Sequence, residues 1–202
     1  MARHSELVKI PRIDRYITKL ALGTAPLGGL FTSVAESDAE ATILTAAQSG
    51  INYFDTAPLY GYGNAERRLG SALNKSGKPF VLSTKVGRIL EKIDPSKPSV
   101  DDSLGSYVDV DKTLTPVFDF SREGILRSIE ESLKRLNISA IDIAYIHDAD
   151  DRIGEAIEKS YPVLDELRSQ GVLKGIGVGM NYCAPSIKAV KEMDLDIILI
   201  AG

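Results

Sequence analysis

Short apolar runs alternate with longer amphipathic segments along the chain. The apolar runs are mostly continuous in hydrophobicity, which is typical of parallel strands covered on both faces. They predict six strands, at residues 19–23, 51–55, 80–85, 141–147, 172–178 and 195–200. The helical periodicity between them predicts helices at 38–49, 64–74, 122–136, 153–170 and 184–193.

Capping and turn residues refine these helices. Ser37 is the expected N-cap of the first helix, which should close at Gly50. Gly171 is placed to end the fourth helix, and Pro162 within it is expected to kink it.

Regular alternation of strand and helix indicates an α/β protein with a parallel sheet. An open, doubly wound dinucleotide-binding sheet carries G-x-G-x-x-G after its first strand. Here GTAPLGG occupies 23–29, and GYGNAE at 61–66 has Glu66 in place of the third glycine. We therefore predict a (β/α)8 TIM barrel with about six strand-helix units present. Residues 1–202 are expected to form one barrel domain that is incomplete at its C-terminus.

The segment 88–120 departs from this alternation. It is rich in Pro, Asp and Ser and is longer than an ordinary connection. It predicts an irregular loop that is either functional or mobile.

Composition restricts the class of protein. The 202 residues are 44% hydrophobic and 26% charged, as in an ordinary globular chain. A net charge of −4 gives no reason to expect nucleic acid or an anionic membrane as partner, and no run approaches the roughly 18 apolar residues of a membrane span. One cysteine, Cys183, and a polar N-terminus predict a reducing, cytoplasmic location. Cys183 is expected to be a buried packing residue, and the oligomeric state is open.

Polar side chains stand where four predicted strands end. Asp55 ends the second strand and Lys85 the third, while His147 ends the fourth and Asn181 follows the fifth. The carboxyl ends of parallel barrel strands open on one face, where active sites are built. Tyr60, in the loop after the second strand, can reach the same ring.

Each residue also has a structural interpretation. Asp55 could stabilise its turn, and Lys85 could be a solvated strand-end lysine. Tyr62 is expected to pack within its loop. His147 precedes acidic residues, but the spacing fits no standard ligand set, so we expect no metal.

In combination, these groups suit proton transfer. A free phenol has a pKa of about 10, which a neighbouring ammonium lowers. Lys85 could act on Tyr60 in this way, with Asp55 holding the lysine. His147 could orient a substrate oxygen. The set fits chemistry on an alcohol or carbonyl.

At these residues the chain resembles the aldo-keto reductases. The matching segments are DTAPLYGYGNAERRLG (55–70), VLSTKVGR (81–88), SIEESLKRLNISAIDIAYIHD (128–148) and LKGIGVG (173–179). Within the family it looks most like sugar 1-dehydrogenases acting on L-fucose, L-galactose or D-threo-aldoses, and like pyridoxal 4-dehydrogenase. The resemblance places the family's catalytic tetrad on Asp55, Tyr60, Lys85 and His147.

The resemblance implies NAD or NADP bound across the barrel mouth, with cofactor contacts from Gly23, Thr24, Asp55 and Asn181. Many members hold the nicotinamide amide with a Ser-Asn pair. This chain reads Gly-Met-Asn at 179–181, so Asn181 would act one position late. Hydride would pass between nicotinamide and C1 of an aldose, with Tyr60 as general acid/base.

Other functions stay open. Within the family these are pyridoxal 4-dehydrogenase or a general aldehyde reductase. From other classes they are a non-catalytic nicotinamide-binding regulatory barrel and a flavin- or phosphate-binding barrel. The family's chain is longer by two strand-helix units that carry most of the cofactor's phosphate and adenosine contacts. NAD versus NADP, the reaction direction and the identity of the sugar or aldehyde therefore stay open.

Overall fold

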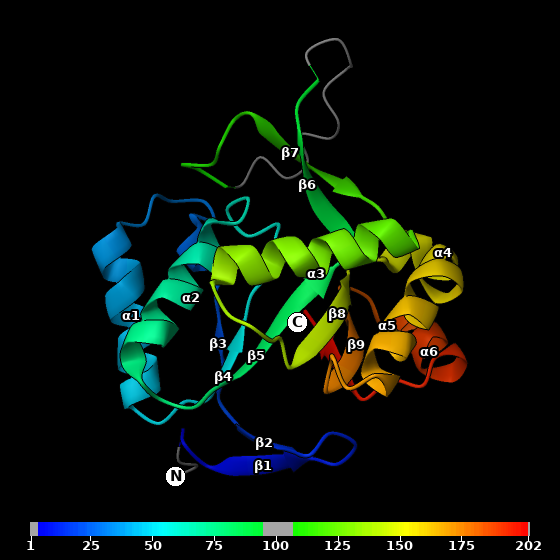
Figure 1. Cartoon of the computed structure of the whole chain (residues 1–202), viewed down its shortest axis with the longest axis horizontal. Helices are drawn as coiled ribbons and strands as arrows, with labels where there is room; N and C mark the ends of the chain where they lie inside the picture. Colours follow the sequence, from blue (N-terminus) through cyan, green and yellow to red (C-terminus); the bar gives the residue numbers. More distant parts are fainter. Residues whose placement is uncertain (1–3, 95–106, 202) are drawn as a thin grey trace.

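The computed structural model describes residues 4–94 and 107–201. Six parallel strands form its main sheet (Figure 1). These are β3 (Leu22–Gly23), β4 (Tyr53–Asp55), β5 (Val81–Val86), β8 (Ile143–His147), β9 (Gly175–Met180) and β10 (Ile197–Ile200). They neighbour one another in chain order. In a doubly wound sheet the order of the strands reverses at a switch point. The unbroken chain order seen here is instead that of a (β/α) barrel, as predicted.

Helices cover the outer face of the sheet. They are α1 (Glu36–Gln48), α2 (Asn64–Ser76), α3 (Arg122–Leu136), α4 (Ile153–Glu155), α5 (Tyr161–Ser169) and α6 (Cys183–Glu192). The larger hydrophobic core lies between the two layers. Phe54, Leu82 and Ile146 of the strands and Leu69 and Ile125 of the helices are all fully buried there.

The helix boundaries differ from the prediction at two points. The N-cap of α1 is Ala35, and Ser37 lies inside the first turn, because the amides of Asp38 and Ala39 already bond to the Ala35 carbonyl. The fourth predicted helix is interrupted by a π turn, η4 (Ala156–Ser160), which ends two residues before Pro162. Proline offers no N–H to the preceding turn, so hydrogen bonding shifts there.

Two antiparallel hairpins were not predicted. β1 (Leu7–Ile10) pairs with β2 (Arg15–Thr18). β6 (Arg88–Lys92) pairs with β7 (Leu114–Phe118), so the flanks of the segment 88–120 are ordered, and the expectation of one irregular loop was wrong there. The middle of that segment, 95–106, lies outside the described residues.

The first hairpin closes the amino end of the sheet (Figure 1). Ile10 and Ile13 form a second core cluster with residues of the central strands. Those residues are Tyr53, Val81, Ile143 and Tyr145. The hydroxyls of Tyr53 and Tyr145 lie 2.8 Å apart within this cluster.

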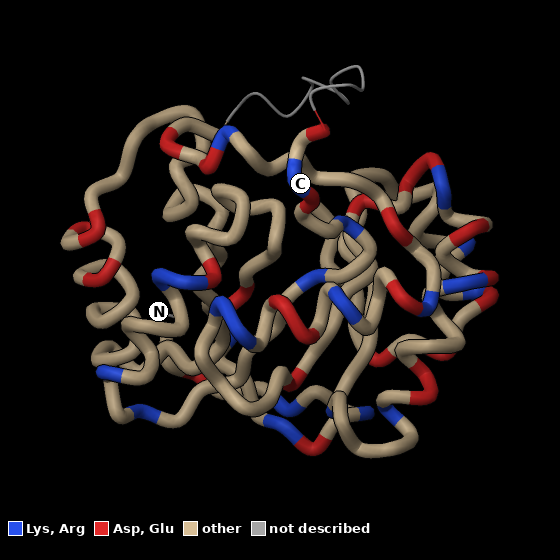
Figure 2. Tube along the Cα trace, turned by 45° about the horizontal axis from the view of Figure 1, so that its top comes forward, with Lys and Arg blue, Asp and Glu red and all other residues tan. Residues whose placement is uncertain are grey.

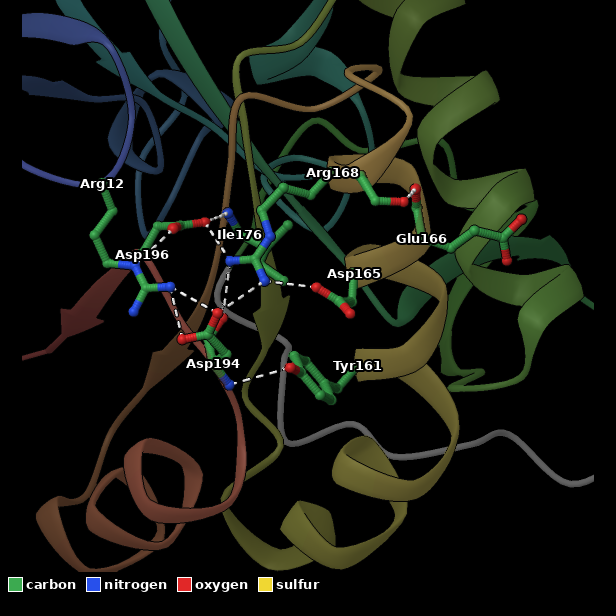
Figure 3. Close-up of polar contacts among 9 residues, drawn as sticks. Arg12, Tyr161, Asp165, Glu166, Arg168, Ile176, Asp194 and Asp196 are labelled. Atoms are coloured by element: carbon green, nitrogen blue, oxygen red, sulfur yellow. Dashed lines mark hydrogen bonds and ion pairs between the residues drawn. The ribbon is translucent and has the colours of Figure 1, made fainter.

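Ion pairs fasten the hairpin to the far end of the described chain (Figure 3). Arg12 pairs with Asp196 at 3.2 Å and with Asp194 at 2.6 Å. Arg168 of α5 pairs with Asp196 at 2.9 Å, and the Ile176 amide donates to the same carboxylate at 3.0 Å. The Asp196 side chain is 4% exposed, so it is the buried centre of this network.

Charged residues of both signs are interspersed along the trace (Figure 2). Within the described residues, no helix combines the length and apolar character needed to cross a membrane. Cys183 is exposed at the start of α6, so the expectation that it is buried was wrong.

We predict that Asp196→Ala lowers the free energy of unfolding by about 2–4 kcal/mol, because Arg168 and the Ile176 amide lose a buried acceptor. Chemical denaturation measures this. Asp14→Ala is the matched control: its carboxylate is 92% exposed beside Lys9, and its loss should cost less than about 0.5 kcal/mol. Equal effects of the two substitutions would contradict the prediction.

Candidate active site

The carboxyl ends of β4 and β5 place an ion pair inside the barrel. Lys85 donates to the Asp55 carboxylate at 2.5 Å and to the Thr56 carbonyl at 2.9 Å. The other Asp55 oxygen accepts from the Ser83 hydroxyl at 2.6 Å. Lys85 is 1% exposed, so its buried ammonium is held by the Asp55 carboxylate and the Thr56 carbonyl, while Ser83 holds the carboxylate.

A close backbone contact positions the loop that carries Tyr60. A Cβ added to Gly61 would lie 2.2 Å from the Gly28 carbonyl oxygen, and one added to Gly28 would meet the backbone of Tyr60 and Gly61 at 2.7 Å. Gly61 also has φ +61°, and Tyr62 has φ +51°. Only glycine fits this approach, so the segment after β3 sets the height of Tyr60 above the strands.

Tyr60 lies among the other predicted site residues. The Lys85 nitrogen is 4.7 Å from the centroid of its ring. The His147 ring packs edge-on against it, at a centroid distance of 5.8 Å, and the Tyr107 ring lies 6.4 Å away. The structure thus brings Asp55, Tyr60, Lys85 and His147 together.

The protonation states of the pair follow from burial and charge. Burial favours the neutral amine of Lys85, but the Asp55 carboxylate and the Tyr60 oxygen together raise the lysine pKa above its usual value. Burial likewise raises the pKa of the Tyr60 phenol, although Lys85 acts to lower it. The expected net lowering of the Tyr60 pKa was therefore wrong. At neutral pH the pair is an ammonium beside a protonated phenol.

His147 is a neutral imidazole. Burial lowers its pKa well below 6.5, and the charges of Lys85 and Arg88 act in the same direction. Among the described residues, its Nδ1 atom has no hydrogen-bond partner. Nε2 lies 3.5 Å from the Asp148 carboxylate, which favours the proton on Nε2. Nε2–H is therefore the donor available to a ligand.

Asn181 follows β9 and is held by two carboxylates. Its side-chain nitrogen donates to Asp148 at 3.0 Å and to Asp150 at 3.1 Å. Its backbone N–H donates to Asp150 at 2.9 Å. The amide oxygen is thereby the group left to accept from a ligand.

The other predicted cofactor residues, Gly23 and Thr24, lie at the end of β3, next to Asp55. Gly23 is exposed at the end of β3, and an added Cβ would meet nothing within 4 Å. Thr24 is buried, and its hydroxyl and amide both donate to the Asp55 carbonyl at 3.0 Å. Thr24 therefore joins the ends of β3 and β4.

A pocket of about 250 Å³ opens over these groups. Tyr60, Lys85, His147 and Asn181 line it, whereas Gly23 and Thr24 do not. Its other lining residues include Ala25, Leu59, Tyr107, Asp148, Gly179 and Leu199. Among the described residues, no group of three or more His, Cys, Asp or Glu side chains could hold a metal ion.

Four polar residues of the site were missed from the sequence as site residues. Ser83 could have been found, since it lies two positions before Lys85 and so faces the same side of β5. Arg88 is buried and pairs with Asp148 at 2.7 Å. Asp148 was considered only as a metal ligand, and Tyr107 lies in the segment predicted to be irregular.

The chain is similar to known proteins. Residues 19–201 match the model of the Aldo/keto reductase family. Pyridoxal 4-dehydrogenase from Microbacterium luteolum is 37% identical over 98% of this chain and 62% of its own length. D-threo-aldose 1-dehydrogenase from a Pseudomonas species is 39% identical over 92% of this chain and 57% of its own. This chain thus spans about 60% of these relatives' length.

A solved structure has the same fold. The holo form of an aldo-keto reductase from Bacillus halodurans superposes with a TM-score of 0.72 at 25% identity. The match covers 98% of this chain and 58% of that one.

We predict that His147 stays neutral through pH 6.5, where an unperturbed imidazole is about half protonated. Because the unfolded chain takes up this proton first, the contribution of His147 to the free energy of unfolding is complete above about pH 6.5 and declines below it. The sequence has two histidines, so ring ¹⁵N NMR of His4→Gln reports His147 alone. A titration midpoint at or above 6.5 would contradict the assigned state.

Proposed function

The chain belongs to the Aldo/keto reductase family, and on this premise we propose an NAD(P)-dependent oxidoreductase that moves hydride between nicotinamide and C1 of an aldose. The observation that carries the proposal is the buried ammonium of Lys85, clamped by Asp55 and set 4.7 Å from the Tyr60 ring. An ammonium in that place stabilises a phenolate, which a binding site has no need to form.

Tyr60 is the proposed proton carrier. In reduction its phenol gives a proton to the carbonyl oxygen as the carbon gains hydride. In oxidation its phenolate takes the proton of the C1 hydroxyl as C1 loses hydride, so a pyranose becomes a lactone. Lys85 stabilises the phenolate in both directions, and the Nε2–H of His147 holds the reacting oxygen.

The donor set at the strand ends fits a nicotinamide. Asp148 and Asp150 fix the Asn181 nitrogen, so the side-chain oxygen can accept from a carboxamide N–H. Gly23 leaves its backbone open to a ligand, and Thr24 and Asp55 hold the adjoining strand ends together. When bound, the nicotinamide supplies or accepts the hydride.

The proposed substrate class is a sugar hemiacetal or small aldehyde, handled in the cytoplasm. It rests on the likeness to an aldose 1-dehydrogenase at 39% identity. Pyridoxal oxidation is the second candidate, favoured by the relative of that name at 37% identity. A pyridoxal ring carries an aldehyde and hydroxyls, so the same proton carrier would serve.

A regulatory barrel that only binds nicotinamide is the alternative from another class. It would need Asn181 and the strand-end backbone but neither the lysine-phenol pair nor the neutral imidazole. The burial of Lys85, at 1% exposed, costs free energy that binding alone does not require.

We predict that Tyr60→Phe lowers kcat by about 10²–10⁴-fold, because the proton carrier is lost. Cofactor affinity, measured by quenching or enhancement of NAD(P)H fluorescence, should change less than about threefold. Turnover is followed by absorbance with L-fucose, L-galactose, D-arabinose and pyridoxal, each with NAD and NADP.

Tyr62→Phe is the matched control. It removes a phenol from the same loop and should keep most of the turnover. Cofactor binding without turnover of any of these substrates by the wild-type chain would favour the regulatory barrel.

A further inference from the structure

Asp148 is a pocket carboxylate whose role in the proposed function is so far limited to fixing the side-chain nitrogen of Asn181. It directly follows His147 and lines the pocket with Tyr60 and Lys85. Its backbone N–H donates to the Gly179 carbonyl at 2.8 Å, which ties it to the end of β9. Its φ is +46°, a conformation that residues other than glycine seldom adopt and that recurs at functional sites.

Two neighbours fix its carboxylate. Arg88 donates to Oδ2 at 2.7 Å, and Asn181 donates to Oδ1 at 3.0 Å. Arg88 is itself buried, with its guanidinium 4.4 Å from the centroid of the Phe118 ring. A carboxylate offers about four acceptor positions, and these contacts among the described residues account for two of them. The side chain is 28% exposed, so the group is rigid yet reachable from the pocket.

The position of this carboxylate relative to His147 defines what it can reach. Its Oδ2 lies 3.5 Å from Nε2, the atom proposed to hold the reacting oxygen. A ligand whose carbonyl or C1 oxygen sits at Nε2 has room to place the next carbon, and a hydroxyl on it, within reach of Asp148. A hydroxyl donating to a carboxylate forms a charge-assisted hydrogen bond, about twice as strong as a neutral one.

We propose that Asp148 is a specificity-determining residue that accepts a hydrogen bond from the hydroxyl on the carbon next to the reacting carbon. The preferred substrates are then 2-hydroxyaldehydes and the aldoses that contain this unit. The inference rests on the proposed function and narrows its substrate class. Arg88 acts as a positioning residue, because it aims the carboxylate that would read the hydroxyl.

A purely structural ion pair between Arg88 and Asp148 is the simpler interpretation. It accounts for the 2.7 Å contact and the burial of Arg88. It predicts no difference between substrates that differ by one hydroxyl, so substrate discrimination separates the two interpretations.

Lactaldehyde and propanal provide this test, since they differ only in the 2-hydroxyl. We expect the wild type to reduce lactaldehyde with the higher kcat/KM. Asp148→Asn keeps the shape but loses the charge, and it should lower the lactaldehyde-to-propanal ratio of kcat/KM by about 10-fold or more. A general effect of the substitution on His147 would lower kcat/KM for both aldehydes alike and leave the lactaldehyde-to-propanal ratio unchanged.

Asp150→Asn is the matched control, because Asp150 also accepts from Asn181 but does not line the pocket. This substitution should change kcat/KM for both aldehydes by the same factor. Asp148→Glu retains the charge and decides the matter if Asp148→Asn fails to fold, since a displaced carboxylate should also lower the ratio. An unchanged ratio in a folded Asp148 variant overturns the inference while the proposed function stands.

Wild-type turnover of neither aldehyde would instead be a failure of the proposed function. Saturation-transfer NMR with L-fucose then tests recognition alone. Weaker transfer to Asp148→Asn than to wild type supports the assignment, and equal transfer overturns it.

Discussion

The ion pair between Lys85 and Asp55 is the contact on which the site depends. An unpaired ammonium that is 1% exposed would be strongly unfavourable, so the lysine charge exists there only because a carboxylate lies 2.5 Å away. Ser83 and Thr56 complete the polar surroundings of the two charges. A fixed positive charge under Tyr60 then stabilises phenolate in a place where burial favours phenol, so the two effects oppose each other at the atom that exchanges the proton.

The parallel sheet gathers the remaining groups without any of them being near in sequence. β4, β5, β8 and β9 end at one face, and each contributes a polar residue at or just after its last positions. The loop carrying Tyr60 is held by backbone contact with Gly28, so a segment with no reactive side chain sets the position of the phenol. The strands therefore set the positions of the polar side chains at their ends, and the loop contact sets the position of Tyr60.

The sheet strands and the polar residues at their ends could be predicted from the sequence. The β6–β7 hairpin, the Tyr60 pKa and the place of Asp148 in the pocket could not. Continuous apolar runs located all six sheet strands, and strand-end polarity located Asp55, Lys85 and His147, because both signals are local. The β6–β7 ladder joins residues more than twenty positions apart and contains Pro116, so no turn motif or alternation announced it. Predicting the net shift of the Tyr60 pKa requires knowing how the ring is packed, and the spacing of residues along the chain does not give this. Asp148 was overlooked as a pocket wall for the same reason.

The pairing of Arg12 with Asp196 joins residues 184 positions apart. Closing so long a loop costs chain entropy that the contact can repay only late in folding. During synthesis the hairpin β1–β2 leaves the ribosome long before its carboxylate partners exist. Ile10 and Ile13 are therefore expected to stay partly exposed until β10 is synthesised. Ile197 and Leu199 of β10 then pack against their cluster, and Asp196 pairs with Arg12.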